Sequence, residues 1–328
     1  MGRNIYAEGV VRLVRVDGIV DDFTDAVTYC GLPLIRSEAL PADALVLVVS
    51  GGRPLSAGRR LDALGIAHLD YFSFLRHSGL PLVEISMNEG FREDYASNRA
   101  RYEWCRSLLD DDESRRIFDQ LIAFKTTYDI ACLEGFATRE DEQYFEDFLK
   151  LSPDGECFVD VGGFDGANTL EFIRHAPGYR SVQLFEPDPA NFRVCQSRLE
   201  GLRDVHLYGM GVAERRAELR MQPLGSTSRL ADDGPIVVPV DRLDRLLEGC
   251  DPPTLIKMDI EGAELAALEG ARGLILDHHP RLAISAYHVA GDYYRIPEVI
   301  LGMRRDYRIL MRHYTESIYE TVLFFLSD

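Results

Sequence analysis

The chain has 328 residues, with 36 Lys and Arg against 54 Asp and Glu, so its formal net charge is −18. Hydrophobic residues make up 46% of it and charged residues 27%, which excludes a disordered chain and suits one or two globular domains. The acidity disfavours nucleic acid, whose binding proteins carry basic surfaces, and it disfavours docking on anionic membranes. We therefore expect neither nucleic acid nor membrane insertion.

The sequence also carries compartment signals. No apolar run approaches the roughly 18 residues of a transmembrane helix, and the first residues lack the apolar stretch of a signal peptide. The six cysteines are widely spaced and form no CxxC pair, as expected of idle thiols in a reducing environment. These features predict a cytoplasmic protein.

Residues 1–82 are expected to form a small Rossmann-like α/β domain. The β-branched run 45–49 is typical of a buried strand, and helical spacing follows over 55–64. Gly9 is one glycine where a dinucleotide fingerprint needs three, so we expect no dinucleotide there. Residues 83–150 are expected to be a helical linker or cap, with a last amphipathic helix over 140–149.

Residues 151–328 alternate strands and helices. The predicted strands cover 157–159, 182–185, 205–208, 255–258 and 282–286, and two further strands, 307–311 and 321–326, have no helix between them. Such alternation predicts a doubly wound α/β fold, and the closing hairpin puts an antiparallel strand into an otherwise parallel sheet.

A glycine loop joins the first of these strands to its helix. Gly162, Gly163 and Gly166 let the backbone turn tightly and approach a ligand closely. Glu186 ends the next strand, where a carboxylate can bind both hydroxyls of a ribose. The glycine loop and Glu186 together predict a nucleoside-containing cofactor.

Two carboxylates beside the loop distinguish between cofactors. Asp160 and Asp165 flank the glycines and would repel the pyrophosphate of NAD. The same charges attract the sulfonium and ammonium groups of S-adenosylmethionine. Electrostatics therefore favours S-adenosyl-L-methionine over NAD.

Three further residues are candidates for catalysis. Asp259 and Glu261 follow a central strand, at the edge where open α/β sheets bind their ligands. Glu264 is expected only to favour the start of the next helix through the helix dipole. His288 follows the neighbouring strand and is the expected general base.

These motifs resemble those of the FkbM family of S-adenosylmethionine-dependent methyltransferases. The resemblance covers about residues 140–328 and is carried by 158–166, 185–187 and 256–264, with further similarity at 286–288, 312–314 and 320–323. It implies a class I methyltransferase fold with a seven-stranded mixed sheet. It also implies O-methylation, commonly of sugars, glycans or natural products.

The resemblance assigns roles by position. The implied cofactor-binding residues are Asp160, Gly162, Gly163, Asp165, Gly166, Glu186, Pro187, Gly209, Met210 and Tyr144. The implied substrate-binding residues are Ser226, Ser228 and His313. The expected acceptor is a hydroxyl of a small molecule or glycan, nucleotide-linked sugars included.

The expected mechanism is in-line methyl transfer to a hydroxyl, with His288 as base and with Asp259 and Glu261 orienting either the hydroxyl or the histidine. In a variant of this hypothesis, the three residues hold Mg²⁺, which lowers the pKa of the hydroxyl. An NAD-dependent sugar oxidoreductase and a non-catalytic scaffold stay open as alternatives. Whether the chain forms a homo-oligomer also stays open.

Overall fold

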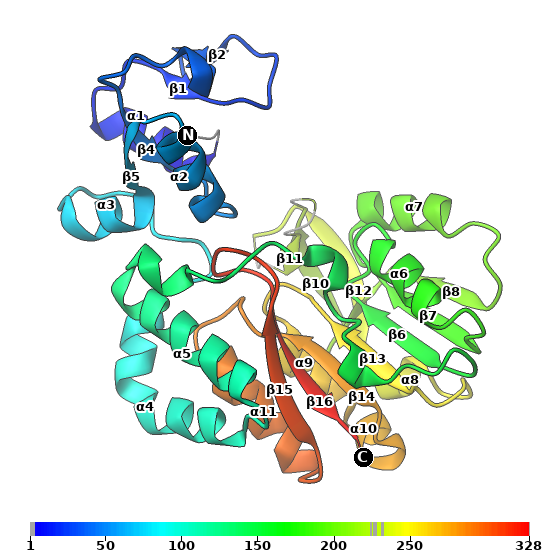
Figure 1. Ribbon diagram of the computed structural model, residues 1–328. Helices are drawn as coiled ribbons and strands as arrows, with labels where there is room; N and C mark the ends of the chain where they lie inside the picture. Colours follow the sequence, from blue (N-terminus) through cyan, green and yellow to red (C-terminus); the bar gives the residue numbers. More distant parts are fainter. Residues whose placement is uncertain (1–3, 224, 226–227, 231–232, 328) are drawn as a thin grey trace. The chain divides into compact units, whose positions relative to one another are not determined.

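The computed structural model describes residues 4–223, 225, 228–230 and 233–327, and they divide into two compact units (Figure 1). The first unit contains the chain up to Ser97, with Arg116–Glu140 and His313–Tyr319. The second contains Asn98–Arg115, Asp141–Arg312 and the segment from Glu320 onward. The units differ from the expected limits at 82 and 150, because helices α4 (Phe91–Leu108) and α5 (Asp112–Thr127) each contribute to both.

The second unit is built on a seven-stranded sheet with the order β15-β16-β14-β13-β6-β7-β8. Its strands are β6 (Cys157–Val161), β7 (Ser181–Phe185), β8 (Val205–Tyr208), β13 (Leu255–Met258), β14 (Arg281–Ser285), β15 (Arg308–His313) and β16 (Thr321–Leu326). Neighbours from β8 to β14 pair in parallel, and β16 pairs antiparallel with β14. Strands β6, β7 and β13 are buried throughout, which explains why their sequences are mostly apolar, with the charged residues Asp160 and Lys257 paired to each other. The predicted α/β fold with a seven-stranded mixed sheet is confirmed.

Helices connect these strands. They are α6 (Ala167–His175), α7 (Pro189–Arg198), α8 (Leu243–Leu246), α9 (Glu264–Gly270), α10 (Arg272–His278) and α11 (Asp292–Met303). A smaller four-stranded sheet, in the order β11-β10-β12-β9, was not predicted. It comprises β9 (Gly211–Val212), β10 (Ala217–Gln222), β11 (Arg229–Leu230) and β12 (Ile236–Asp241). Strands β9 and β10 are short or only half-buried and lack a continuous apolar run, and Pro239 within the apolar run of β12 argues against a strand there.

The order of the strands determines where a ligand can bind. From β6 the chain continues to β7 on one side, and it later reaches β13 on the other side. The crevice outside the carboxyl ends of β6 and β13 is therefore the topological switch point, where open α/β sheets bind ligands. The strands that precede the predicted glycine loop, Glu186, Asp259 and His288 all end at this edge.

The segment 140–149 is not the continuous helix that we expected. It forms two short 3₁₀ turns, Glu140–Glu142 and Asp147–Leu149, with Tyr144 between them at a φ of 73°. A left-handed backbone at a tyrosine is unfavourable and interrupts any helix. The buried Tyr144 side chain has a hydrogen-bonding role that accounts for this conformation and is described with the site.

The first unit contains two small sheets, in the orders β1-β3-β2 and β4-β5. Its elements are α1 (Ile5–Leu13), β1 (Ile19–Val20), β2 (Thr28–Tyr29), β3 (Leu32–Ile35), β4 (Leu45–Val48), α2 (Pro54–Ala63), β5 (Ala67–Asp70) and α3 (Tyr71–His77), with 3₁₀ turns at Ser37–Ala39 and Ile130–Leu133. Val46 and Val48 pack with Leu61 and Ile66 in a small core. The strand expected at 45–49 and the helix expected at 55–64 are thus present.

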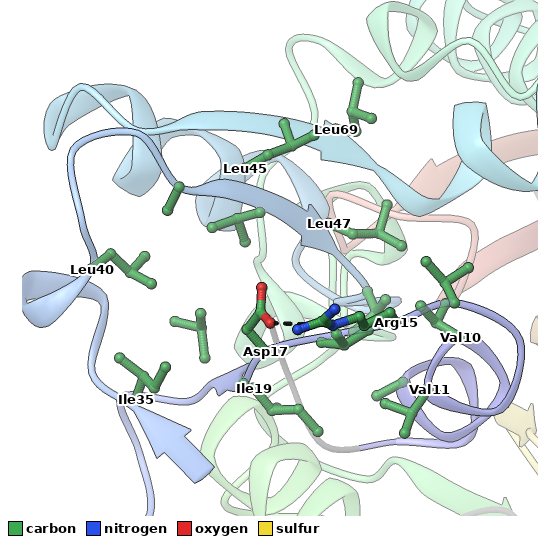
Figure 2. A pocket seen from close by; sticks show the side chains of 18 of the residues that line it. Val10, Val11, Arg15, Asp17, Ile19, Ile35, Leu40, Leu45, Leu47 and Leu69 are labelled. Carbon is green, nitrogen blue, oxygen red and sulfur yellow. Dashed lines mark ion pairs between the residues drawn. The ribbon is translucent and has the colours of Figure 1, made fainter. Parts of the chain in front are cut away.

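The first unit contains a cavity of about 610 Å³, whose lining side chains are drawn in Figure 2. Leu45, Leu47 and Leu69 line it from the parallel pair β4–β5. Its charged lining residues are Asp43 and the solvent-exposed ion pair Arg15–Asp17, at 3.9 Å. The apolar lining agrees with the missing glycine fingerprint, because a pyrophosphate would find few hydrogen-bond donors there.

Candidate active site at the edge of the sheet

Glycine is required where β6 meets its loop. Gly162 has a φ of 85°, and a Cβ there would lie 1.9 Å from the carbonyl oxygen of Asp259. A Cβ on Gly163 would lie 2.5 Å from the Leu184 side chain. The amides of Gly162 and Gly163 both donate to the carbonyl of Phe185, at 2.9 and 3.1 Å. The loop is thus held against β7 and β13, and its glycines permit this close approach.

A buried ion pair supports the loop from below. The Asp160 carboxylate is fully buried and lies 3.1 Å from Lys257 Nζ, and its other oxygen accepts a hydrogen bond from Thr169 at 2.9 Å. Lys257 Nζ also donates to the carbonyl of Gly162, at 2.6 Å. Burial opposes the charge of Lys257, but the Asp160 carboxylate raises the lysine pKa above its usual value. Asp160 therefore shapes the loop through Lys257, a residue to which sequence reasoning gave no role.

Glu186 is positioned by the backbone on both of its oxygens. They accept hydrogen bonds from the amides of Phe164 and Asp188, each at 2.8 Å. Burial, helped by the Asp188 charge, raises the pKa of Glu186, whereas the two amides and Lys257 lower it. The net result is a pKa of about 7. Two backbone anchors fix the carboxylate rigidly beside the glycine loop.

The other predicted cofactor residues lie around the ends of β6, β7 and β8. Asp165 pairs with Arg198 at 2.5 Å and accepts a hydrogen bond from the amide of Ala167. Gly209 is exposed and Met210 is half-buried, directly after β8. A Cβ on Gly211, the next residue, would lie 3.8 Å from the ring of Pro187. The structure thus brings Pro187 close to the segment that follows β8, where Gly209 and Met210 are expected to bind the cofactor.

A polar cluster forms where β13 and β14 end. The buried Tyr144 hydroxyl donates to Asp259 Oδ2 at 2.7 Å and lies 3.0 Å from the Ser285 hydroxyl. The other Asp259 oxygen, Oδ1, is 3.3 Å from His288 Nε2. Burial opposes ionisation of Asp259, but His288 and Lys257 hold its pKa well below the usual range. The structure thus brings Tyr144, Asp259 and His288 together at one point.

His288 lies between carboxylates. Its Nδ1 is 3.0 Å from Glu264 Oε1, and its Nε2 faces Asp259 and, at 3.8 Å, Glu261 Oε2. Burial opposes the charge, but these carboxylates raise the pKa of His288 well above its usual value. A histidine held protonated cannot accept a proton, so this environment does not favour the expected role of His288 as a base.

Glu264 does more than start a helix. It is the first residue of α9, as expected, and its Oε1 accepts a hydrogen bond from the amide of Ile260 at 2.9 Å. It is also almost fully buried and contacts His288, which the helix-dipole explanation did not predict. Burial of a carboxylate beside a histidine identifies it as part of the site.

Sequence reasoning gave no site role to a further carboxylate, the half-buried Glu320. It accepts hydrogen bonds from Gln143 at 2.6 Å and from the Tyr287 hydroxyl at 3.0 Å, and burial together with the Asp259 charge raises its pKa to about 7. A signal did exist. Glu320 directly precedes β16, and the start of an antiparallel strand lies at the carboxyl ends of its parallel neighbours.

The predicted substrate residues have different surroundings. Ser226 lies outside the described residues. Ser228 donates to Asp188 Oδ2 at 2.7 Å, which ties its loop to the start of α7. His313 belongs to the first unit, where its ring lies 4.5 Å from that of Phe136 and its Nε2 lies 2.9 Å from the carbonyl of Ser317. Burial lowers the pKa of His313 to about 3, so this histidine is neutral.

One group of side chains has the geometry to bind a metal ion. Asp259, Glu264 and His288 each offer a ligand atom, and these atoms all lie within 4.8 Å of one another. The Mg²⁺ variant expected from the sequence had Glu261 in place of Glu264.

Comparison with known proteins identifies the domain that carries these features. Residues 160–309, which span the glycine loop and the polar cluster, match the model of the methyltransferase FkbM domain. The chain carries an FkbM methyltransferase domain. The match confirms the resemblance seen in the sequence and supports methyltransferase as the class of function.

One solved FkbM structure is similar over most of the chain, and two other solved structures are similar over about half of it. The methyltransferase FkbM of Methylobacillus flagellatus KT is similar at a TM-score of 0.78 and 27% identity, covering 98% of this chain and 87% of its own. An rRNA methylase from Streptococcus thermophilus is 18% identical over 56% of this chain and 92% of its own, at a TM-score of 0.38. Aeropyrum pernix fibrillarin, solved with natively bound S-adenosyl-L-methionine, is 11% identical over 53% of this chain and 67% of its own, at 0.36. No curated protein matches the chain.

Membrane crossing was also tested against the structure. Among the described residues, no helix combines the length and the apolar character that crossing a bilayer requires.

Proposed function

We propose that the protein is an S-adenosyl-L-methionine-dependent O-methyltransferase acting on a hydroxyl of a small molecule or glycan, nucleotide-linked sugars included. The observation that carries this proposal is the glycine loop with Glu186 fixed beside it by two backbone amides. The Glu186 carboxylate is placed to accept hydrogen bonds from ribose hydroxyls. The flanking carboxylates Asp160 and Asp165 are paired with Lys257 and Arg198, so the proposal rests on the loop and Glu186 rather than on their charge.

When bound, S-adenosylmethionine supplies a methyl group on a positively charged sulfur. The protein must then hold the acceptor hydroxyl in line and remove its proton as the new bond forms. Asp259, Glu264 and Glu320 each accept hydrogen bonds from the protein. Glu261 accepts none from the described residues, its side chain is partly exposed, and burial raises its pKa to about 7. We therefore assign to Glu261 the role of the base that accepts the hydroxyl proton. Glu261 follows β13 and has a left-handed φ of 55°.

The cofactor assignment is tested by calorimetry with S-adenosylhomocysteine and with NAD⁺ on the full chain. We expect binding of S-adenosylhomocysteine only. Binding of NAD⁺ alone would favour an oxidoreductase, and binding of neither would favour a scaffold. Native mass spectrometry of the purified protein then shows whether a sugar nucleotide copurifies.

The base assignment is tested with Glu261→Gln. General bases contribute about 10²- to 10⁴-fold to rate, so we expect kcat to fall by that amount while S-adenosylhomocysteine affinity stays within about twofold. The matched control is Glu248→Gln at an exposed position, which we expect to leave kcat unchanged. Full activity of Glu261→Gln would move the base elsewhere.

A further inference from the structure

Three side chains that follow β13 and β14 have buried polar atoms without hydrogen bonds. Asp259 Oδ1, Glu264 Oε2 and both ring nitrogens of His288 are inaccessible to solvent and form no hydrogen bond with the described residues. Glu264 and His288 are more than nine-tenths buried. Each unsatisfied group of this kind costs about 1–3 kcal/mol, and more when charged, so the cluster is incomplete as protein alone.

Each carboxylate is anchored through one oxygen and leaves the other unpaired. Asp259 Oδ2 accepts the Tyr144 hydroxyl at 2.7 Å, and Glu264 Oε1 accepts the amide of Ile260 at 2.9 Å. The unpaired oxygens are Asp259 Oδ1 and Glu264 Oε2. Metal sites have this organisation, because outer hydrogen bonds orient the ligands and leave the inner oxygens for the ion.

His288 faces a carboxylate with each ring nitrogen, and a cation bound at one of these nitrogens would replace the proton that the carboxylates otherwise hold there. Its nitrogens lie 3.0 Å from Glu264 and 3.3 Å from Asp259, yet neither contact has the geometry of a hydrogen bond. The ligand atoms of the three residues all lie within 4.8 Å of one another. The nearby cation Lys257 is engaged by Asp160 at 3.1 Å, so it only partly offsets the buried negative charge.

We propose that Asp259, Glu264 and His288 bind a divalent cation. Two carboxylates and one imidazole form a mixed oxygen and nitrogen set, which suits first-row ions such as Mn²⁺ better than Mg²⁺. Three protein ligands leave coordination positions open, where hydroxyls of the acceptor could bind and be acidified. That catalytic role rests on the proposed function, whereas binding of the ion does not. The set leaves Glu261 outside the metal shell and free to take the proton.

The full chain is first treated with a chelator and kept without cofactor. Mn²⁺ is then added, and its binding is measured from the electron paramagnetic resonance signal of the free Mn²⁺. We expect one ion per chain. Glu264→Gln and Asp259→Asn should each raise the Kd for Mn²⁺ at least tenfold. Tyr144→Phe, which removes only the hydrogen bond to Asp259, should raise it about 10- to 100-fold. Glu269→Gln, on the same helix but outside the cluster, should bind like the native chain.

Folding is monitored separately, because a variant could lose the metal by unfolding. Mn²⁺ should raise the Tm of the native chain and of Glu269→Gln, and it should not raise that of Glu264→Gln. Metal-free Glu264→Gln should keep a cooperative unfolding transition. The proposal is overturned if the native chain binds no Mn²⁺ at 1 mM, a concentration typical of weak sites, or if Glu264→Gln binds it equally well. S-adenosylhomocysteine binding is measured apart from the metal, so either proposal can fail alone.

Discussion

Replacing Lys257 by methionine tests how the glycine loop is supported. Lys257 Nζ lies 3.1 Å from the fully buried Asp160 and donates to the Gly162 carbonyl at 2.6 Å. Methionine keeps much of the side-chain volume, so the change removes charge and hydrogen bonds rather than packing. Asp160 is then left buried without its cation, and the Gly162 carbonyl loses its donor.

The expected magnitude follows from these contacts. Removing one partner of a buried ion pair costs about 3–5 kcal/mol, because the remaining charge is uncompensated. The lost hydrogen bond to Gly162 belongs to the same network, so its cost is not added separately. We expect the free energy of unfolding of the second unit to fall by about 4 kcal/mol. S-adenosylhomocysteine affinity should also fall, because the ion pair positions the loop.

Urea unfolding, followed by a probe in the second unit, measures this change. The control Lys150→Met alters an exposed lysine and should cost less than about 0.5 kcal/mol. Adding Asp160→Asn to Lys257→Met removes both charges, so the double variant should be more stable than the sum of the two single changes predicts. If Lys257→Met costs no more than Lys150→Met, the loop does not depend on the buried ion pair.

Three further predictions concern glycine geometry and titration. Gly162→Ala should abolish S-adenosylhomocysteine binding, because its Cβ would overlap a backbone carbonyl 1.9 Å away; Gly249→Ala, with a similar φ but open space, should bind normally, and equal effects would contradict this explanation. Glu186 has a pKa of about 7, and ribose hydroxyls favour its ionised form, so calorimetry should show affinity falling up to about tenfold per pH unit below pH 7. Affinity of the native chain that does not change with pH would refute this. Glu186→Gln, which cannot ionise, should show such pH-independent affinity. Asp111, with its pKa lowered to about 2 by Arg312, should stabilise the chain above pH 4 and lose this contribution as pH falls toward 2. Asp111→Asn should therefore cost about 1 kcal/mol in urea unfolding at pH 7, allowing for solvent screening, and nothing near pH 2; a cost independent of pH would contradict the ion-pair origin.

The sequence alone was sufficient for the sheet and the loop. Strands such as β6 and β13 are buried on both faces, so each is mostly apolar apart from one residue of the Asp160–Lys257 ion pair, and this pattern can be recognised without knowledge of the neighbouring strands. Glycines between a strand and a helix indicate a tight turn by themselves. Strand order then placed Asp259 and His288 at one edge, because carboxyl ends of parallel strands meet there.

Only the tertiary structure decided which atoms of the site are paired. Tyr144 lies 115 positions from Asp259 in the sequence, yet the two form a hydrogen bond of 2.7 Å. Glu320 reaches the site from the last strand, and Glu264 turns from a helix start toward His288. The pKa values of buried acids and the unpaired oxygens depend on such long-range contacts, which no local pattern records. The net charge of −18 is a property of composition. The placement of three carboxylates around His288 is a property of the fold.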